Sequence, residues 1–230
     1  MFSRLVASAK RYVRVPYKGG SQTNKSMLEA ERKVFGVGMS KTGTSTLADC
    51  FQILGLVPVA GFNGKLKELV RAGREPDPVN DKFDYDVRAP LVHEEIMEDI
   101  LAVARSYVSF QDSPWYMLYP YLDRAFPGSK FILTERKDAE TQAISDWYHN
   151  RRRGACQGTI DPTFLAAQIK KYQDHNCAVR EYFRDRDSDL LVVCWEEGHG
   201  WNELCSFLDV PHPGVPFPHA NPGEHSNHGS

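Results

Sequence analysis

The chain has 230 residues, of which 41% are hydrophobic and 25% are charged, and its formal net charge is −2. This composition is typical of a globular protein and excludes a chain that is disordered throughout. The length suits one α/β domain with its own core. The absence of a basic excess argues against a nucleic-acid partner, so any anionic ligand must be met by a local site.

The two ends of the chain differ in composition from its middle. Residues 1–30 are basic and include a glycine-rich polar stretch at 19–24, so we expect a flexible or docking arm there. One ordered domain is expected over 31–222. The remaining segment, 223–230, is expected to be a disordered tail.

Cysteine usage indicates the compartment. The five cysteines are an odd number, and their spacings match neither a zinc site nor a Cys-x-x-Cys motif. Cys50 and Cys194 lie among apolar residues, which predicts buried thiols in a reducing compartment. No apolar run approaches the length of a membrane span, and we therefore expect a cytoplasmic protein.

Hydrophobic periodicity predicts strands that alternate with helices. In chain order the pattern predicts a strand at 34–37, a helix at 44–54, a strand at 56–59, a helix at 65–71, a loop at 73–90, a helix at 91–104, a strand at 107–110, a helix at 115–126, a strand at 130–133, helices at 137–151 and 161–184, a strand at 190–194 and a helix at 201–208. Gly55 predicts the end of the first helix, and Asp161-Pro162 predicts the start of the longest one.

This alternation predicts an α/β fold with three layers, in which a central parallel sheet is flanked by helices on both faces. In such sheets, ligands bind beyond the carboxyl ends of the strands. Gly38, Asp112 and Arg136 each follow a predicted strand. We therefore expect these three residues to lie at one edge of the sheet.

The segment from Gly38 to Thr46 has the composition of a phosphate-binding loop. Gly38 and Gly43 allow backbone N–H groups to converge on an anion, and the hydroxyl residues at 44–46 begin the following helix. Lys41 adds a full positive charge. A glycine-containing turn with a chance lysine is the alternative, and the strand before the loop and the helix after it count against that.

The position of the lysine separates this loop from that of nucleoside triphosphatases. Gly38 and Gly43 have the spacing of G-x-x-x-x-G-K-[ST], but Thr44 stands where the lysine should be. Lys41 lies inside the loop, which favours a shorter phosphate chain. The sequence also offers no strand-end aspartate and Mg²⁺ set of the kinase or GTPase kind.

The loop resembles one in a known family. The phosphosulfate-binding loop of sulfotransferases that use 3′-phosphoadenosine 5′-phosphosulfate (PAPS) is similar to Ser40-Lys41-Thr42-Gly43-Thr44-Ser45. In the cytosolic steroid and phenol branch, a tryptophan that stacks on adenine usually comes next. Thr46 holds that place here, so the adenine contact must come from elsewhere. The resemblance implies a fold like that of P-loop nucleotide-binding proteins.

A second segment, 131–145, resembles the motif with which sulfotransferases hold the 3′-phosphate. Arg136 ends its strand, and an arginine can hold a phosphate with a bidentate fork. The family's serine usually lies eight residues after the arginine. Ile144 has that spacing here, Ser145 lies one residue further, and Thr141 is a substitute.

Asp112 is the expected general base for the acceptor. Asp112-Ser113-Pro114 resembles an Asp-x-Pro element of one sulfotransferase branch, and the segments 201–208 and 216–221 resemble the end of that branch. There a C-terminal helix packs on the sheet, and the prolines after it cross near the nucleotide. The rival bases are Asp86, His93, Glu94 and Glu95.

Together the resemblances imply a sulfotransferase that moves a sulfuryl group from PAPS to a hydroxyl or amine of a small molecule or carbohydrate and releases 3′-phosphoadenosine 5′-phosphate (PAP). No metal is expected, and the sequence leaves room for a homodimer. The implied donor-binding residues are Ser40, Lys41, Thr42, Gly43, Thr44, Ser45, Thr46, Arg136 and Ser145. The implied catalytic residues are Lys41 and Asp112.

Other interpretations stay open at this point. The chain could be a P-loop kinase, or a non-catalytic protein that binds a nucleotide or a partner on the same scaffold. Arg136 could form a surface ion pair with Glu135 or Asp138, and Asp112 could cap the next helix. The arginines at 151–153 could face an anionic ligand, but a solvated helix end is the more usual role of such a run.

Overall fold

Five parallel strands form one sheet in the order β2-β3-β1-β4-β5. In chain order the strands are β1 (Val34–Gly36), β2 (Val59–Ala60), β3 (Ser109–Phe110), β4 (Lys130–Glu135) and β5 (Leu190–Cys194). Every strand lies at or beside a predicted apolar run. The parallel sheet is the one that the alternation of strands and helices predicts.

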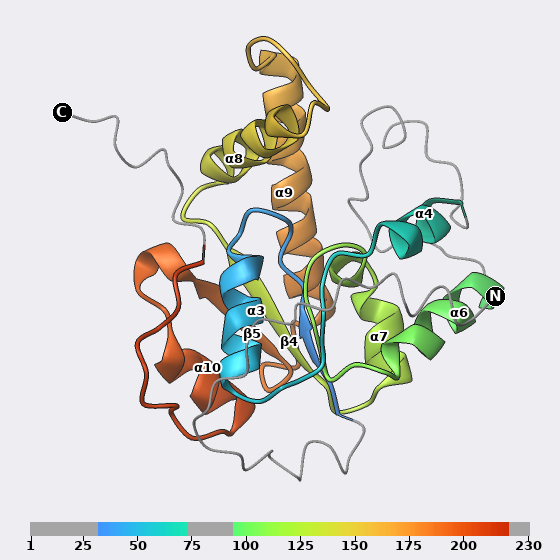
Figure 1. Cartoon of the computed structure of the whole chain (residues 1–230), viewed down its shortest axis with the longest axis vertical. Coiled ribbons are helices and arrows are strands. Elements are labelled where there is room, and N and C mark those ends of the chain that lie inside the picture. Colours follow the sequence, from blue (N-terminus) through green and yellow to red (C-terminus); the bar gives the residue numbers. More distant parts are fainter. Residues whose placement is uncertain (1–31, 73–93, 221–230) are drawn as a thin grey trace.

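The structure, a computed structural model, describes residues 32–72 and 94–220 (Figure 1). The arm expected at 1–30, the loop at 73–90 and the tail at 223–230 lie outside these residues. The domain boundaries therefore stay predictions.

Seven α-helices connect or follow the strands within the described ranges. They are α3 (Thr44–Ile53), α4 (Gly64–Ala72), α6 (Glu94–Ala104), α7 (Tyr119–Ala125), α8 (Ala139–Arg152), α9 (Pro162–Tyr182) and α10 (Trp201–Leu208). Asp161 caps α9 as predicted, because its carboxylate accepts hydrogen bonds from Thr163 N at 2.7 Å and Phe164 N at 3.0 Å. None of the described helices is long and apolar enough to cross a membrane.

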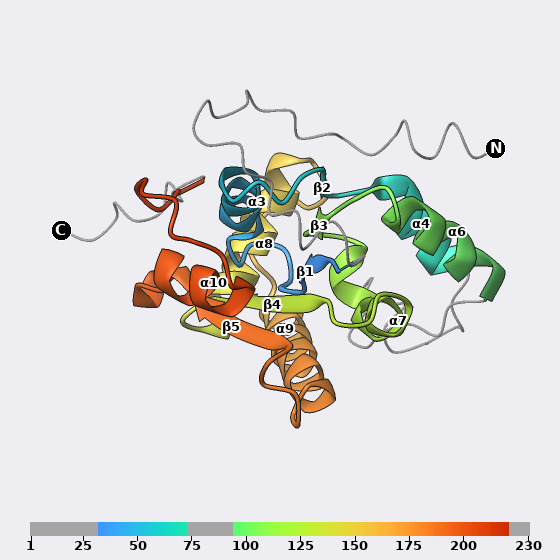
Figure 2. The same ribbon diagram turned by 90° about the horizontal axis from the view of Figure 1, so that it is seen from below.

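Alternate residues of the central strands face opposite sides of the sheet. Phe35 and Phe131 belong to a core shared with α4, α6, α7 and α9, whereas Val34 and Ile132 pack with α3 and α10. Figure 2 shows α3 and α9 on opposite sides of the sheet. Helices cover both faces, so the three-layer α/β fold is confirmed.

The predicted helix at 115–126 is wrong as one continuous element. The structure has a 3₁₀-helix, η1 (Trp115–Met117), and then the separate helix α7. Pro120 is the reason, because inside a continuous helix it could not donate to the carbonyl of Tyr116 and its ring would clash with that carbonyl. At the start of α7, where no such donor is needed, proline is tolerated.

Two further elements differ from the sequence-based expectation. The strand predicted at 56–59 begins only at Val59, because Pro58 has no N–H and contributes its carbonyl alone, which accepts from Val108 N at 3.0 Å. A short 3₁₀-helix, η2 (Trp195–Glu197), follows β5 and had no counterpart in the periodicity. Residues of η2 belong to the candidate active site described below.

The order of the strands reverses between β1 and β4. From β1 the chain crosses to β2 and β3 on one side, and from β4 it crosses to β5 on the other. Folds of this kind bind ligands beyond the carboxyl ends of the strands at such a reversal. Figure 1 shows the loop after β1 at this edge, between α3 and the pair α8 and α9.

Candidate active site

The loop after β1 lies directly on β4. A β-carbon at Gly38 would overlap Thr134 Oγ1 and would lie 2.6 Å from the carbonyl oxygen of Thr134. The hydroxyl of Thr42 is buried, lies 2.6 Å from Thr134 Oγ1 and donates to Met39 O at 2.7 Å. Only glycine at position 38 lets the loop lie this close to Thr134 of β4. The Thr42 hydroxyl is engaged in hydrogen bonds within the protein and is not available to a ligand.

Two residues of the loop have left-handed backbone conformations just before α3. Lys41 (φ 70°) and Gly43 (φ 90°) are both in the left-handed region, and α3 begins directly after Gly43. No side chain caps α3 in the described structure, so the N–H groups of its first turn have no partner there. Alternating handedness followed by a helix N-terminus is an anion-binding arrangement.

His175 on α9 is hydrogen-bonded to the start of the phosphate loop. Its Nε2–H donates to the carbonyl of Val37 at 2.7 Å, and its ring meets Tyr116 edge-on at 5.2 Å. Burial lowers the pKa of His175 to about 4. The loop therefore rests on a neutral hydrogen-bond donor at physiological pH.

Helix α8 holds the other side of the loop, at Ser40. The Ser40 hydroxyl donates to Asp146 Oδ1 at 2.9 Å, and Gln142 Nε2 donates to the Ser40 carbonyl at 2.9 Å. Asn150 Nδ2 donates to the second carboxylate oxygen of Asp146 at 3.0 Å. The predicted Ser145 is half-buried, and its hydroxyl makes no hydrogen bond to a described residue. Its neighbour Asp146 makes the contact with the loop.

Lys41 lies in a mixed electrostatic environment. Burial lowers the pKa of its ammonium group, and so do the charges of Arg152 and Arg136. The carboxylates of Asp146 and Asp112 act in the opposite direction and favour the charged form. The predicted catalytic lysine therefore lies close to the predicted base, to the predicted second anchor and to the basic end of α8.

Arg136 extends back toward the phosphate loop. Its Nη1 donates to the carbonyl of Lys41 at 3.3 Å, across 95 residues of sequence. Its Nε and Nη2 donate to the two carboxylate oxygens of Glu196 at 3.0 and 2.7 Å. The side chain of Arg136 is 26% exposed and that of Glu196 33%. The two predicted anion anchors are therefore direct neighbours.

The ion pairs that the sequence suggested for Arg136 are not the ones that form. Glu135 pairs with Arg180 at 2.6 Å. Asp138 caps α8, accepting from Thr141 N at 2.6 Å and Thr141 Oγ1 at 2.7 Å. The hydroxyl of Thr141 is thus committed to that cap.

Asp112 is half-buried at the carboxyl end of β3, and its backbone is in the left-handed region (φ 70°). Burial raises the pKa of its carboxyl, and the Ser113 N–H, which donates to Oδ1 at 2.6 Å, partly offsets this. Its side chain does not cap η1, whose N-cap is Pro114. Of the rival bases, Glu94 and Glu95 are exposed, whereas Asp86 and His93 lie outside the described residues.

Several polar groups around Asp112 were not predicted. The charges of Lys67 and then His149 favour ionised Asp112 and so lower its pKa, and burial and Lys41 lower the pKa of His149 itself. Asn63 Nδ2 and Ser113 Oγ are buried without a hydrogen-bond partner among the described residues. An acceptor substrate bound at Asp112 could form hydrogen bonds with these two unsatisfied groups.

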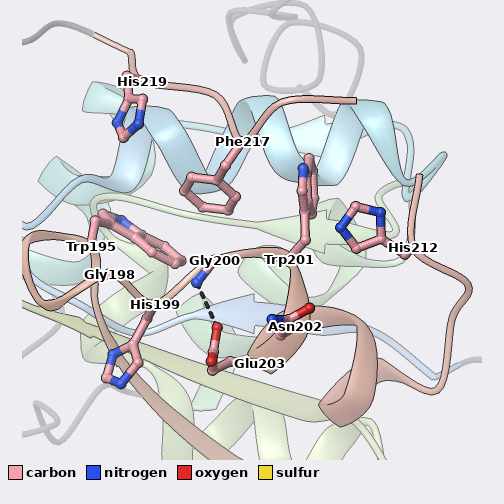
Figure 3. Close-up of a pocket in the computed structure, with 10 residues that line it drawn as sticks. All are labelled: Trp195, Gly198, His199, Gly200, Trp201, Asn202, Glu203, His212, Phe217 and His219. Carbon is pink, nitrogen blue, oxygen red and sulfur yellow. Dashed lines mark hydrogen bonds between the residues drawn. The ribbon is translucent and has the colours of Figure 1, made fainter. Parts of the chain in front are cut away.

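Residues of η2, of α10 and of the segment that follows α10 form a pocket with several aromatic side chains (Figure 3). The indole of Trp195 lies on Gly43, and its Nε1 donates to the Gly43 carbonyl at 3.3 Å. Phe217 lies 5.1 Å from Trp195, and Ala220 N donates to Thr46 Oγ1 at 3.2 Å. The pocket has a volume of about 310 Å³ and is lined by Trp195, Gly198, His199, Gly200, Trp201, Asn202, Glu203, His212, Phe217 and His219.

The sequence analysis missed Trp195 and Glu196. A usable signal was present, because both follow a predicted strand and therefore belong to the edge where ligands bind. The C-terminal segment was expected to cross near the nucleotide, and Ala220 of this segment contacts Thr46 at the start of α3.

The comparison with protein families identifies the class. A profile of the sulfotransferase domain matches residues 33–145 and 138–226, which include the loop, Asp112, Arg136 and Trp195. The chain belongs to the sulfotransferase family, which is a family of transferases. Comparison with curated proteins gives no match.

Proposed function

We propose that the sulfuryl donor is PAPS and that the acceptor is a hydroxyl or amine of a small molecule or carbohydrate. One observation carries the choice of donor. Arg136 Nη1 contacts the Lys41 carbonyl at 3.3 Å, so a bidentate arginine lies directly beside the phosphate loop. A ligand with two separate anionic groups fits this pair of anchors. In PAPS these groups are the 5′-phosphosulfate and the 3′-phosphate.

The proposed donor site assigns a role to each anchor. The first-turn N–H groups of α3, with the hydroxyls of Thr44 and Ser45, receive the 5′-phosphosulfate. Ser40, Thr42 and Thr46 contribute through their backbone, since each hydroxyl already has a protein partner.

The second anchor receives the 3′-phosphate at Arg136. Ser145 is the proposed second donor to this phosphate, because its hydroxyl makes no hydrogen bond to a described residue. Thr141 is a poorer substitute, because its hydroxyl already donates to Asp138.

The aromatic pocket supplies the surface for adenine that Thr46 lacks. Trp195 lies on the loop itself, and Phe217 and His219 come from the segment that crosses the start of α3 (Figure 3). Nucleobases stack on such side chains. We therefore assign the adenine to this pocket.

Lys41 and Asp112 carry the proposed chemistry. The acceptor oxygen or nitrogen attacks sulfur while the bond from sulfur to the bridging phosphate oxygen breaks. Asp112 takes the proton of the acceptor, and the ammonium group of Lys41 stabilises the charge on the departing phosphate of PAP. The raised pKa of Asp112 makes it a stronger base than an ordinary carboxylate. No metal ion is required by these roles.

A P-loop kinase is the second candidate, and a non-catalytic nucleotide-binding protein on this scaffold is the third. In a kinase loop the lysine follows the second glycine, where this chain has the buried Thr44 at the start of α3.

We also propose that the protein is cytoplasmic and forms a homodimer. All five cysteines are free thiols, which agrees with a reducing compartment.

Ligand binding without metal tests the donor. PAP should raise the Tm of the chain in the presence of EDTA, and isothermal titration should give one site. The Arg136→Ala variant should bind PAP more weakly, whereas Arg184→Ala, which removes an exposed arginine paired with Glu181, should not. A labelled-PAPS screen of phenols, alcohols, amines and sugars then identifies the acceptor.

Each alternative has its own outcome in this experiment. Stabilisation by ATP with Mg²⁺, and none by PAP, would favour the kinase. PAP binding without turnover of any acceptor would favour the non-catalytic protein. If calorimetry detects no PAP binding at all, the proposed donor is wrong.

A further inference from the structure

Two adjacent residues, Trp195 and Glu196, contact the two anion anchors separately. Trp195 lies on Gly43 in the phosphate loop, and its Nε1 donates to the Gly43 carbonyl at 3.3 Å. Glu196 holds the guanidinium of Arg136. One peptide unit of η2 therefore connects the loop after β1 with the arginine after β4.

Three donors converge on the Glu196 carboxylate. Arg136 Nε and Lys137 N both donate to Oε2 at 3.0 Å, and Arg136 Nη2 donates to Oε1 at 2.7 Å. This bidentate contact fixes the plane of the guanidinium. Of the five N–H donors of an arginine, Glu196 takes two and the Lys41 carbonyl takes one. Two remain without a partner in the described ranges.

The backbone of Arg136 is held as well. Its N–H donates to the hydroxyl of Tyr172 at 2.9 Å. The main chain is thus fixed from α9 and the guanidinium from η2, and Nη1 points at the loop. The remaining donors are held beside the phosphate loop before any ligand binds, which reduces the ordering required on binding.

On this geometry, and resting on the proposed function, we propose that Glu196 is a positioning residue. It sets Arg136 at a fixed distance from the phosphate loop and so makes the site select nucleotides that carry a 3′-phosphate as well as a 5′-phosphate. Trp195 holds η2 against the phosphate loop through its contact with Gly43. Together, Trp195 and Glu196 fix the distance between the two phosphate sites.

The opposite role for Glu196 has a clear signature. A carboxylate in the arginine fork could act as a competitor that a phosphate must displace. Removing a competitor would strengthen PAP binding, and so would the loss of a nearby negative charge. Removing a positioning residue weakens PAP binding despite that loss of charge. The two roles therefore predict opposite signs.

Isothermal titration with PAP and with 5′-AMP, which lacks the 3′-phosphate, tests the proposal. The wild-type chain should prefer PAP. In Glu196→Ala the Kd for PAP should rise about tenfold, as expected for loss of a charge-assisted contact that orders the arginine, and the Kd for 5′-AMP should stay within about twofold. The ratio of the two constants is the readout, because general loosening of the fold would weaken both ligands.

Two further variants complete the design. Glu197→Ala removes an equal charge from the neighbouring exposed residue and measures the bulk electrostatic effect alone. In an Arg136→Ala background, Glu196→Ala should no longer weaken PAP binding, and only the charge effect measured by Glu197→Ala should remain, as a double-mutant cycle requires when one residue acts through the other.

Three results would overturn the proposal while leaving PAPS as the donor. They are tighter PAP binding by Glu196→Ala than by Glu197→Ala, equal weakening of both ligands, and an undiminished effect of Glu196→Ala in the Arg136→Ala background. A wild-type chain that binds PAP no better than 5′-AMP would instead overturn the proposed function, and this inference with it.

Discussion

The indole of Trp195 covers Gly43 so closely that a β-carbon at position 43 would overlap its Cδ1 and Nε1 atoms. Gly43 also has φ 90°, which an L side chain rarely adopts. Gly43→Ala therefore meets both a conformational penalty and a steric one. We expect it to lower the free energy of unfolding by more than about 2 kcal/mol, measured by urea denaturation, and to abolish PAP binding.

Gly198 is the matched control for Gly43. It has φ 87°, and nothing lies within 4 Å of a β-carbon placed there. Gly198→Ala should thus show only the left-handed penalty of about 1–2 kcal/mol. Equal losses in the two variants would mean that the indole can move aside at no cost.

Lys41→Ala tests the cation at the leaving oxygen. We expect turnover to fall at least a hundredfold, with little change in Tm, because a charge aimed at developing negative charge acts mainly in the transition state. Lys65→Ala, an exposed lysine on α4, should keep full activity. Retained turnover in Lys41→Ala would remove this lysine from the mechanism.

The pH dependence of the wild-type enzyme gives an independent test of Lys41. Burial and neighbouring arginines lower the pKa of its ammonium group. Because the charged form is the active one, kcat should decline on the alkaline side at a pH below the ordinary lysine value of 10.5. This limb should be absent from the residual activity of Lys41→Ala.

Asp112→Asn separates catalysis from stability. Asparagine tolerates the left-handed backbone and can still accept from the Ser113 N–H, so the fold should survive. Activity should fall about a hundredfold or more, and the acidic limb of the kcat/KM profile should disappear. An unchanged acidic limb would assign the base to another residue.

The stability of Asp112→Asn has a definite sign. Burial raises the pKa of Asp112 in the folded state above the unfolded value of 3.8. The folded state therefore binds the proton more tightly, and stability is lost as the pH rises from 3.8 through the folded pKa. At neutral pH the variant should be at least as stable as the wild type in urea denaturation.

His175→Gln should flatten the pH dependence of stability on the acidic side. Burial lowers the pKa of His175 from 6.5 to about 4, so the unfolded chain binds a proton in this window and the folded chain does not. Stability should fall by about 3 kcal/mol between pH 6.5 and 4 on account of this residue. Urea denaturation across the range measures the slope, and the exposed His212→Gln is the control.

Much of the fold could be predicted because its signals are local. Short apolar runs marked the strands, and helical spacing with the Asp161-Pro162 start marked α9. The split between η1 and α7 was also local in origin, since Pro120 interrupts the helix. The periodicity of apolar residues did not reveal this split, because η1 and α7 both face the same core.

Local sequence signals predicted only part of the candidate site. The loop residues and Arg136 stand in recognisable order after strands, which is why they could be named. The contact of Asp146 with Ser40 was not predicted, because it depends on the phase of α8, which is set where Asp138 caps the helix. One residue of shift turns a helical side chain by about 100°.

The alternation of strands and helices, the loop that contains Lys41 and the arginine at the end of β4 could all be read from the amino-acid sequence. Each of these depends on neighbours within a few residues. Two contacts depend on the three-dimensional fold: Trp195 covers Gly43, which lies 152 positions away in the chain, and Glu196 binds the guanidinium of Arg136. The parallel sheet brings the ends of β1, β4 and β5 to one edge, and no local pattern specifies which side chains meet there.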